Sequence, residues 1–131
     1  MDFALRSKLV LGQFNPLIPT PGTSLYARLQ AEGRLLYKRW WLDDDYRYGQ
    51  AIFEPKGMSA ADLTEGCFRL RREFNSYGSI FRRALAPQMN AHSPHHLLAY
   101  LTANLVSRKE ILSKQGEALG DGSALELPET L

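Results

Sequence analysis

The chain has 131 residues, of which 44% are hydrophobic, and a formal net charge of +2 at pH 7. This length suits one domain or part of a larger one, the composition excludes a disordered chain, and so small a charge gives no argument for nucleic-acid binding. The single cysteine, Cys67, excludes an internal disulfide and a cysteine-rich metal site, and it fits a reducing cytoplasm. Because there is no apolar signal core and no apolar run near the ~20 residues of a membrane helix, we expect a soluble cytoplasmic protein.

The N-terminal stretch predicts the end of a helix and then a strand. Residues 2–8 mix polar and apolar types, as the end of a helix does. Residues 9–18 (LVLGQFNPLI) are apolar and short, which predicts one buried strand. Pro16 weakens the strand near its end, because a proline cannot donate to the hydrogen-bond ladder.

A tight loop and a shorter helix follow. Residues 19–23 (PTPGT) contain two prolines and a glycine, which indicates a tight loop. A helix is predicted over 25–32, with Thr23 or Ser24 placed to cap its first amides. Gly33 ends this helix, because glycine tolerates the left-handed conformation.

Residues 34–57 are the least regular part of the sequence and predict a long ordered loop packed by its aromatic side chains. Its aromatic residues include Tyr37, Trp40, Trp41, Tyr46, Tyr48 and Phe53. Within it, residues 50–54 favour a short strand. The acidic run at 43–45 is interpreted as exposed loop rather than a metal site, because consecutive carboxylates point in different directions.

The strongest pattern in the chain predicts an amphipathic helix over 59–86. Ser59 and Asp62 form a capping-box-like start. The apolar stripe comprises Leu63, Cys67, Leu70, Phe74, Tyr77, Phe81 and Leu85. Gly78 leaves open a kink into two helices, because glycine is unfavourable inside a helix, and Pro87 ends the pattern.

A second long helix is predicted over 93–115. Ser93 is the expected cap and Pro94 lies in the first turn, where its missing N–H costs nothing. Its expected buried face comprises Leu97, Leu98, Leu101, Leu105 and Leu112. Gly116 ends the helix, and residues 117–131 are predicted to be a loose tail.

The predicted fold class is mainly α. It comprises two long amphipathic helices packed antiparallel through their apolar stripes, a shorter N-terminal helix, one or two short strands and an aromatic-rich loop. Because burial of the stripes would be stronger with a partner, we predict a homodimer.

Several polar groups are interpreted as structural rather than functional. His92, His95 and His96 have no carboxylate cluster nearby, which favours polar residues at a helix start over a metal site. Cys67 lies on the apolar stripe and is expected to be a buried small hydrophobe. A further set, interpreted as a solvated or ion-paired face with weak nucleic-acid binding as the alternative, comprises Arg69, Arg71, Arg72, Arg82 and Arg83.

Four stretches, taken in order, carry a resemblance to a known family. They are residues 14–26 (FNPLIPTPGTSLY), 32–35 (EGRL), 52–59 (IFEPKGMS) and 71–83 (RREFNSYGSIFRR). The first two are similar to the last barrel strand, the Pro-Gly-Thr loop and the following helix of cobalamin-binding-type radical S-adenosylmethionine enzymes. The last two resemble the F-x-P-x-x-M-S/T segment and the long helix of the helical C-terminal extension. The resemblance spans roughly residues 3–116.

The resemblance implies a cluster of four irons and four sulfurs, held by a Cys-x-x-x-Cys-x-x-Cys motif, that cleaves S-adenosylmethionine to a 5′-deoxyadenosyl radical. In many members it also implies a cobalamin-binding domain upstream. The last strand of the family lies near the adenine of S-adenosylmethionine. Phe14, Asn15 and Leu17 are therefore the candidate cofactor-binding residues, in a complete barrel only.

The sequence departs from the family at the cluster. Cys67 lies in the helical extension, and one cysteine cannot supply three thiolates. We therefore predict no catalytic residue, no metal ligand and no cofactor in this chain alone, and no activity by itself. Met1 falls where relatives are in mid-barrel, which leaves a truncated product, a split protein and a gene remnant as alternatives. Residues 9–18, without barrel neighbours, are expected to pair across a dimer or to lie disordered or refolded.

The function predicted on this basis is a non-catalytic C-terminal or accessory part of a radical S-adenosylmethionine enzyme, which covers the barrel and helps to form the substrate site. The alternative is a stand-alone helical interaction protein. Expected partners are a second copy or the missing barrel chain, rather than a membrane or nucleic acid. The predicted division is a barrel remnant at 1–33, the aromatic-rich loop at 34–57, the helical extension at 58–116 and the tail at 117–131.

Overall fold

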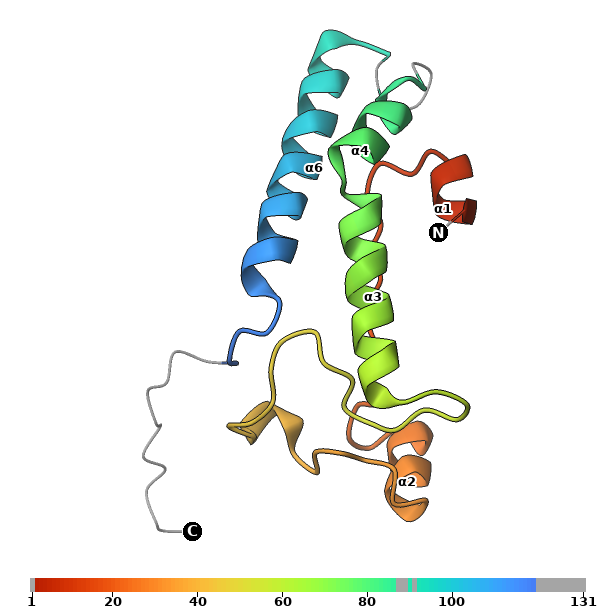
Figure 1. The fold of residues 1–131 in the computed structure, drawn as a ribbon, viewed down its shortest axis with the longest axis vertical. Helices are drawn as coiled ribbons and strands as arrows, with labels where there is room; N and C mark the ends of the chain where they lie inside the picture. Colours follow the sequence, from red (N-terminus) through yellow and green to blue (C-terminus); the bar gives the residue numbers. More distant parts are fainter. Residues whose placement is uncertain (1, 87–89, 91, 120–131) are drawn as a thin grey trace.

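The computed structural model describes residues 2–86, 90 and 92–119, and it is mainly helical, as the sequence predicts (Figure 1). Its elements are α1 (Asp2–Arg6), α2 (Ser24–Ala31), the 3-10 helix η1 (Trp40–Leu42), α3 (Ala60–Phe74), α4 (Tyr77–Ala84) and α6 (Pro94–Lys114). In Figure 1, α6 runs alongside α3 and α4 in the opposite direction. We call α3, α4 and α6 the helical hairpin.

The predicted helix starts are confirmed by their caps. The side chains of Thr23, Ser59 and Ser93 each accept a hydrogen bond from the backbone N–H three residues later. At α3 the capping box is complete, because the Asp62 carboxylate accepts the N–H of Ser59 at 3.2 Å. Gly33 follows α2 with φ +66°, the left-handed conformation expected of a helix stop.

The long helix predicted over 59–86 is two helices, and the break lies before Gly78. Asn75 ends α3, and Ser76 caps α4 by accepting the N–H of Ser79 at 3.3 Å. The kink left open by the sequence is therefore real, but a new serine cap causes it rather than glycine. Pro87 lies outside the described residues.

The break changes which side chains of α4 are buried. Tyr77, Phe81 and Leu85 were expected in the core and are 58%, 67% and 81% exposed, whereas Ile80 and Arg83 are buried at 2% and 1%. A continuous stripe requires one uninterrupted helical phase, and the break at residues 75–76 shifts that phase.

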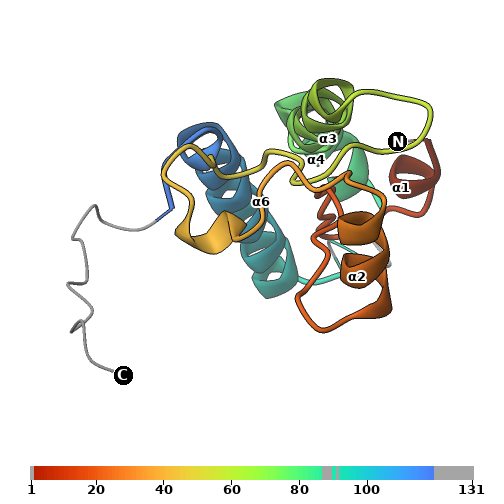
Figure 2. The ribbon, with the colours of Figure 1, turned by 90° about the horizontal axis from the view of Figure 1, so that it is seen from below.

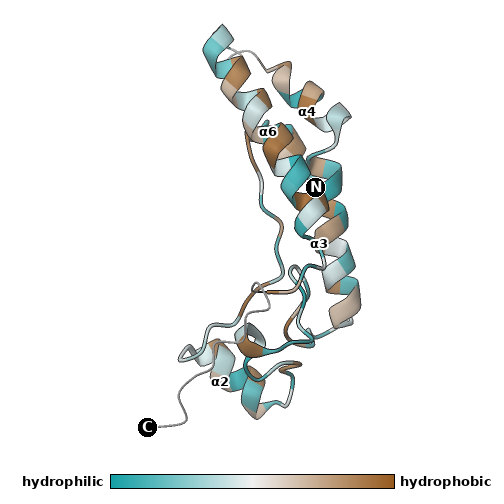
Figure 3. Cartoon of the chain, turned by 90° about the vertical axis from the view of Figure 1, so that its left-hand side faces the viewer, coloured by the Kyte–Doolittle hydropathy of each residue, from teal (hydrophilic) through white to brown (hydrophobic). Residues whose placement is uncertain are grey.

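A similar correction applies to α6. Leu98, Leu105 and Leu112 are 66%, 47% and 51% exposed, while Tyr100 and Asn104 are its buried residues. In Figure 3, parts of the ribbons of α4 and α6 are brown, the colour of hydrophobic residues. The predicted antiparallel pairing of the helices is confirmed, but much of the predicted buried leucine face is exposed.

Residues 9–18 do not form the predicted strand. They run lengthwise past α4 and α3 without joining a sheet (Figure 1), and the described residues contain only two isolated β-bridges. Among the described residues, no second strand lies beside this segment to complete a ladder. Instead the carbonyls of Leu9 and Val10 accept hydrogen bonds from the side chains of Arg83 and Asn104.

The second predicted strand, at 50–54, is reduced to a single antiparallel bridge between Leu35 and Phe53. This pairing helps close a small apolar core whose buried members are Leu29, Tyr46, Ile52 and Phe53. We call α2 and residues 34–57 the aromatic lobe. Seen from below, the lobe spans the ends of α3 and α6 (Figure 2).

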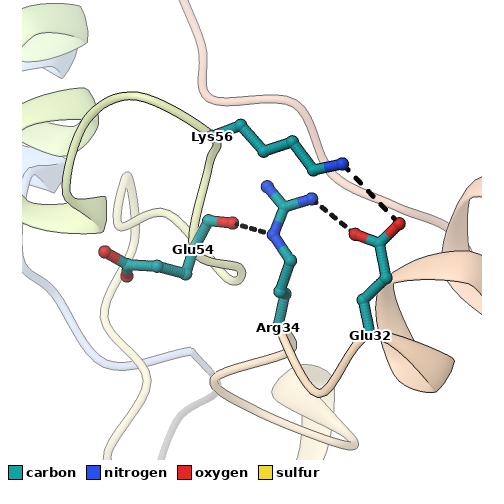
Figure 4. A network of polar contacts seen from close by, with 4 residues as sticks. All are labelled: Glu32, Arg34, Glu54 and Lys56. Carbon is teal, nitrogen blue, oxygen red and sulfur yellow. Dashed lines mark hydrogen bonds and ion pairs between the residues drawn. The ribbon is translucent and has the colours of Figure 1, made fainter.

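A polar network fixes the end of α2 to the segment before α3 (Figure 4). Arg34 donates from Nε to the Glu54 carbonyl at 2.7 Å and from Nη1 to the Glu32 carboxylate at 2.8 Å. Lys56 approaches the other Glu32 oxygen at 3.9 Å. The hydrogen bond from Arg34, aided by Lys56, lowers the pKa of Glu32.

The first residues of the predicted loose tail are ordered against the aromatic lobe. The N–H of Tyr48 donates to the Glu117 carbonyl at 2.8 Å, and the N–H of Gly116 donates to the Tyr48 carbonyl at 3.1 Å. Ala118 forms an isolated bridge with Arg47. The rest of the tail, 120–131, lies outside the described residues.

One further property follows from the lengths and composition of the helices. Within the described part of the chain, none of them is long and apolar enough to cross a membrane.

Candidate functional site

Two adjoining cavities meet at Arg71, where the helical hairpin contacts the aromatic lobe. The first, of about 190 Å³, lies between α3, the C-terminal half of α6 and residues 11–15. We call it the polar cavity, because its lining includes Asn75, Glu110 and Lys114. The second, of about 270 Å³, is the aromatic cavity, lined by Pro16, Ile18, Trp40, Tyr46 and Tyr48 among others. Three residues, Asn15, Tyr48 and Arg71, line both cavities.

Arg71 is a buried cation without a carboxylate partner in the described residues. Arg71 is 4% exposed, and none of the ion pairs among the described residues involves it. Nη2 donates to Gln115 Oε1 at 2.7 Å, while Nε has no hydrogen-bond partner in the same part of the chain. A buried charge is costly unless it is paired and fully hydrogen-bonded, so this guanidinium is an incomplete interaction.

Gly49 allows the lobe to approach this guanidinium closely. It has φ +88°, and a Cβ added there would lie 2.9 Å from Arg71 Nη2 and against the Gln115 side chain. A larger residue at this position would be strained and would displace Arg71 or Gln115. This close approach of the lobe places Tyr48, which precedes Gly49, in the lining of both cavities.

The remaining charges of the polar cavity balance each other. Glu110 and Lys114 lie one helical turn apart on α6, with Lys114 Nζ 3.2 Å from Glu110 Oε1. Asn75 donates from Nδ2 to the Arg71 carbonyl at 3.0 Å, and its buried Oδ1 has no partner in the described part of the chain. Counting the described residues, the cavity therefore has one uncompensated positive charge, that of Arg71.

The structure brings one of the three predicted cofactor-binding residues to this site. Asn15 lines both cavities beside Arg71. Phe14 instead packs on Phe74, with ring centroids 5.4 Å apart. Leu17 is 58% exposed and lines neither cavity.

The interpretation of the arginines as one solvated face is wrong for two of them. Arg71 and Arg83 are buried, which leaves Arg69, Arg72 and Arg82 exposed. The nucleic-acid alternative thus loses two of its five charges to the interior. An arginine can enter a helical interior when its several N–H donors meet carbonyl groups that nothing else satisfies.

Arg83 has that arrangement. Its Nη1 donates to the carbonyls of Leu9 and Val10 at 2.7 and 2.8 Å, and its Nη2 to the Phe74 carbonyl and Asn104 Oδ1 at 3.0 and 2.8 Å. The guanidinium also lies 3.9 Å from the Phe74 ring centroid. Burial lowers the pKa of Arg83. We call these five residues the Arg83 junction, and its role is structural.

The residues that could hold a cluster do not fit one. The sequence has one thiol, Cys67, which is half-buried rather than fully buried as expected, and burial raises the pKa of this thiol while the charge of Arg71 opposes the shift. Within the described residues, no group of three or more His, Cys, Asp or Glu side chains could hold a metal ion. Asp43 instead accepts the N–H of Asp45 in a local turn, and the rings of His92 and His96 are in contact at an interplanar angle of 42°.

Sequence reasoning missed Arg71, Gly49 and Gln115 as members of a site. A signal for Arg71 exists, because it follows Cys67 by four residues and precedes Phe74 by three, which places it within the apolar stripe. No pattern in the sequence links it to Gln115, 44 residues away.

Comparison of the chain with models of known protein families, with curated proteins and with solved structures found no match to any of them.

Proposed function

We propose that this chain is a non-catalytic C-terminal or accessory part of a radical S-adenosylmethionine enzyme, where it covers the barrel and contributes to the substrate site. The observation that carries the proposal is the open backbone of residues 9–19. Among the described residues, no N–H group of this segment donates a hydrogen bond, and the carbonyls of 11–19 accept none. An apolar segment with this many free groups is suited to pair with a strand of another chain.

The side chains of the segment support the same proposal. Leu11, Leu17 and Ile18 are 48%, 58% and 43% exposed. The segment then enters the Pro-Thr-Pro-Gly-Thr loop and α2, the order that the resemblance associates with the last barrel strand. An open backbone combined with exposed apolar side chains indicates a surface that another chain covers.

We propose the barrel chain, or a second copy of this chain, as the partner. The iron–sulfur cluster, S-adenosylmethionine and any cobalamin would be bound by the barrel chain, because the donor atoms here do not suit a cluster. Asn15, and with it Phe14 and Leu17, would contribute to the cofactor side of the completed barrel. A reducing cytoplasm is the compartment that suits a chain with an unpaired cysteine and such a partner.

Anaerobic reconstitution with iron and sulfide tests the non-catalytic part of the proposal. We expect no visible absorption band of a cluster and no 5′-deoxyadenosine from S-adenosylmethionine under reducing conditions. A stable cluster with cleavage would mean that Cys67 from several chains, or other ligands, builds a site, and would overturn this part.

Complementation tests the structural part. A cobalamin-binding-type radical S-adenosylmethionine enzyme, shortened before its last barrel strand, is co-produced with this chain, and S-adenosylmethionine cleavage is measured. The wild-type chain and Gln13→Ala should restore cleavage, whereas Gln13→Pro should not, because proline removes an N–H from the pairing edge. Failure of the wild-type chain, or equal rescue by Gln13→Pro, would contradict pairing through this segment.

A further inference from the structure

The guanidinium of Arg71 is a buried cation of the described chain that is incompletely hydrogen-bonded and borders open space. It is buried, it has one side-chain hydrogen bond, to Gln115, and it adjoins two cavities of about 190 and 270 Å³. Arg83, whose Nε likewise has no partner in the described residues, donates four hydrogen bonds from its two terminal nitrogens, whereas those of Arg71 donate one. The difference indicates that the terminal nitrogens of Arg71 can take a further acceptor, which the described part of the chain does not provide.

The charges of the polar cavity indicate how much negative charge that acceptor has. Glu110 and Lys114 pair with each other, so Arg71 leaves a net charge of about one positive unit. A carboxylate compensates one unit, whereas a phosphate has about −1.5 to −2 at neutral pH. A carboxylate also matches the planar donor fork of an arginine, with two parallel hydrogen bonds.

The lining of the aromatic cavity indicates the chemical character of the rest of the ligand. Trp40, Tyr46 and Pro16 line it, and Tyr46 is 4% exposed within the lobe core. Burial raises the pKa of Tyr46, in line with an apolar environment. Because Arg71 and Tyr48 line both cavities, one ligand can contact the guanidinium and the aromatic wall together.

We propose that the two cavities form one binding site for a small organic monocarboxylate, whose carboxylate pairs with Arg71 and whose apolar body occupies the aromatic cavity. Asn15 and Asn75 line the polar cavity beside the charged end of the ligand. This inference rests on the described residues alone and does not depend on the radical S-adenosylmethionine proposal.

The test uses the full chain and four probes in isothermal titration calorimetry: 3-phenylpropionate, its neutral isostere 3-phenylpropionamide, acetate and inorganic phosphate. We expect 3-phenylpropionate to bind with a stoichiometry of one, and more tightly than the other three. No binding of 3-phenylpropionate, equal binding of the amide, or tighter binding of phosphate would each overturn the proposal. Quenching of Trp40 fluorescence, measured in a Trp41→Phe background, reports whether the phenyl group enters the aromatic cavity.

Two variants distinguish a ligand site from a structural role. Gln115→Glu places a carboxylate within hydrogen-bond distance of Arg71 Nη2, so it should keep the fold and lower the affinity for 3-phenylpropionate about tenfold or more. Arg71→Met should lower it similarly, because the charge is removed while the aliphatic stem is retained. Arg72→Met, an exposed neighbour, should bind as the wild type does. Unchanged affinity in a folded Gln115→Glu variant, judged by circular dichroism, would overturn the assignment of Arg71 as the recognition group.

Discussion

The helical hairpin and the aromatic lobe differ in what they bury. The lobe buries Leu29, Tyr46, Ala51, Ile52 and Phe53, all hydrophobic. The buried polar and charged residues of the described chain are Arg71, Asn75, Ser79, Arg83, Asn90 and Asn104, and all of them lie in or between the helices of the hairpin. Beside them the hairpin buries only Phe74, Ile80 and Tyr100 among its hydrophobic residues.

The two regions are therefore stabilised by different interactions, apolar burial in the lobe and hydrogen bonds in the hairpin. Burial in the lobe gains free energy in proportion to apolar area and tolerates small shifts. The interior of the hairpin depends on directional hydrogen bonds, each of which leaves an unsatisfied group if its partner is lost. The hairpin consequently exposes apolar side chains that a purely hydrophobic helix pair would bury. These side chains are free to pack against another protein surface.

The largest expected effect is at the Arg83 junction. Arg83→Met keeps the volume of the stem but removes four hydrogen bonds, and among the described residues only the Val10 carbonyl of their four acceptors keeps another donor, Asn104 Nδ2. We expect the free energy of unfolding to fall by about 4 kcal/mol, as for breaking a buried charged interaction. Urea unfolding followed by circular dichroism measures it, with exposed Arg82→Met as the control that should stay within about 0.5 kcal/mol. A loss as small as that of the control would mean that the hairpin is hydrophobically stabilised after all.

A slightly smaller effect is expected in the lobe. Ile52 is 1% exposed, and Ile52→Ala should lower the free energy of unfolding by about 3 kcal/mol through lost transfer energy and a cavity. The matched control is Leu36→Ala, where the side chain is 50% exposed. Equal losses in both variants would show that the lobe is not the apolar core described above.

The exposed apolar face of the hairpin should affect association rather than stability. Phe81→Glu and Leu98→Glu change side chains that are 67% and 66% exposed, so each should alter the free energy of unfolding by no more than about 0.5 kcal/mol. Light scattering at micromolar concentration should give a dimer for the wild type and a monomer for the double variant. A clean monomer for the wild type would contradict the proposed homodimer.

The smallest effect concerns pH and the network in Figure 4. Because the pKa of Glu32 is lowered in the folded state, the carboxylate stabilises the fold above its unfolded pKa, and this contribution is lost as the pH falls through the folded pKa. The Glu32→Gln variant should therefore lose less stability than the wild type as the pH falls below about 4.3, the ordinary pKa of glutamate. Thermal melts from pH 6 to pH 3 compare the two proteins, and parallel curves would contradict a role for this pair.

The parts of the fold that the sequence predicts well are those fixed by near neighbours. The caps at Ser59 and Ser93 and the stop at Gly33 each depend on residues within one turn, and all three are confirmed. The strand at 9–18 was wrong because a strand needs a partner, and none is described in the chain. The burial of Tyr77, Phe81 and Leu85 was wrong because one capping serine shifts the helical phase.

The candidate site was predictable only in part for the same reason. Asn15 was identified through the resemblance, and it does line the cavities. Arg71 was assigned to a solvated or ion-paired face, which suits an arginine because this residue is almost never fully buried unless paired. Its burial follows from contacts with Gln115 and from the close approach allowed by Gly49, neither of which is local in sequence.

The Arg83 junction also sets the order in which the chain can fold. Arg83 lies 74 residues after Leu9 and 21 before Asn104, so three distant segments must meet before its four hydrogen bonds can form. Each long closure has an entropic cost that is recovered only when all the bonds form. Residues 9–10 precede α4 and α6 in the chain, so during synthesis they lack these docking partners until both helices have followed. The native contacts of residues 9–10 with Arg83 and Asn104 can therefore form only after α4 and α6 have been made.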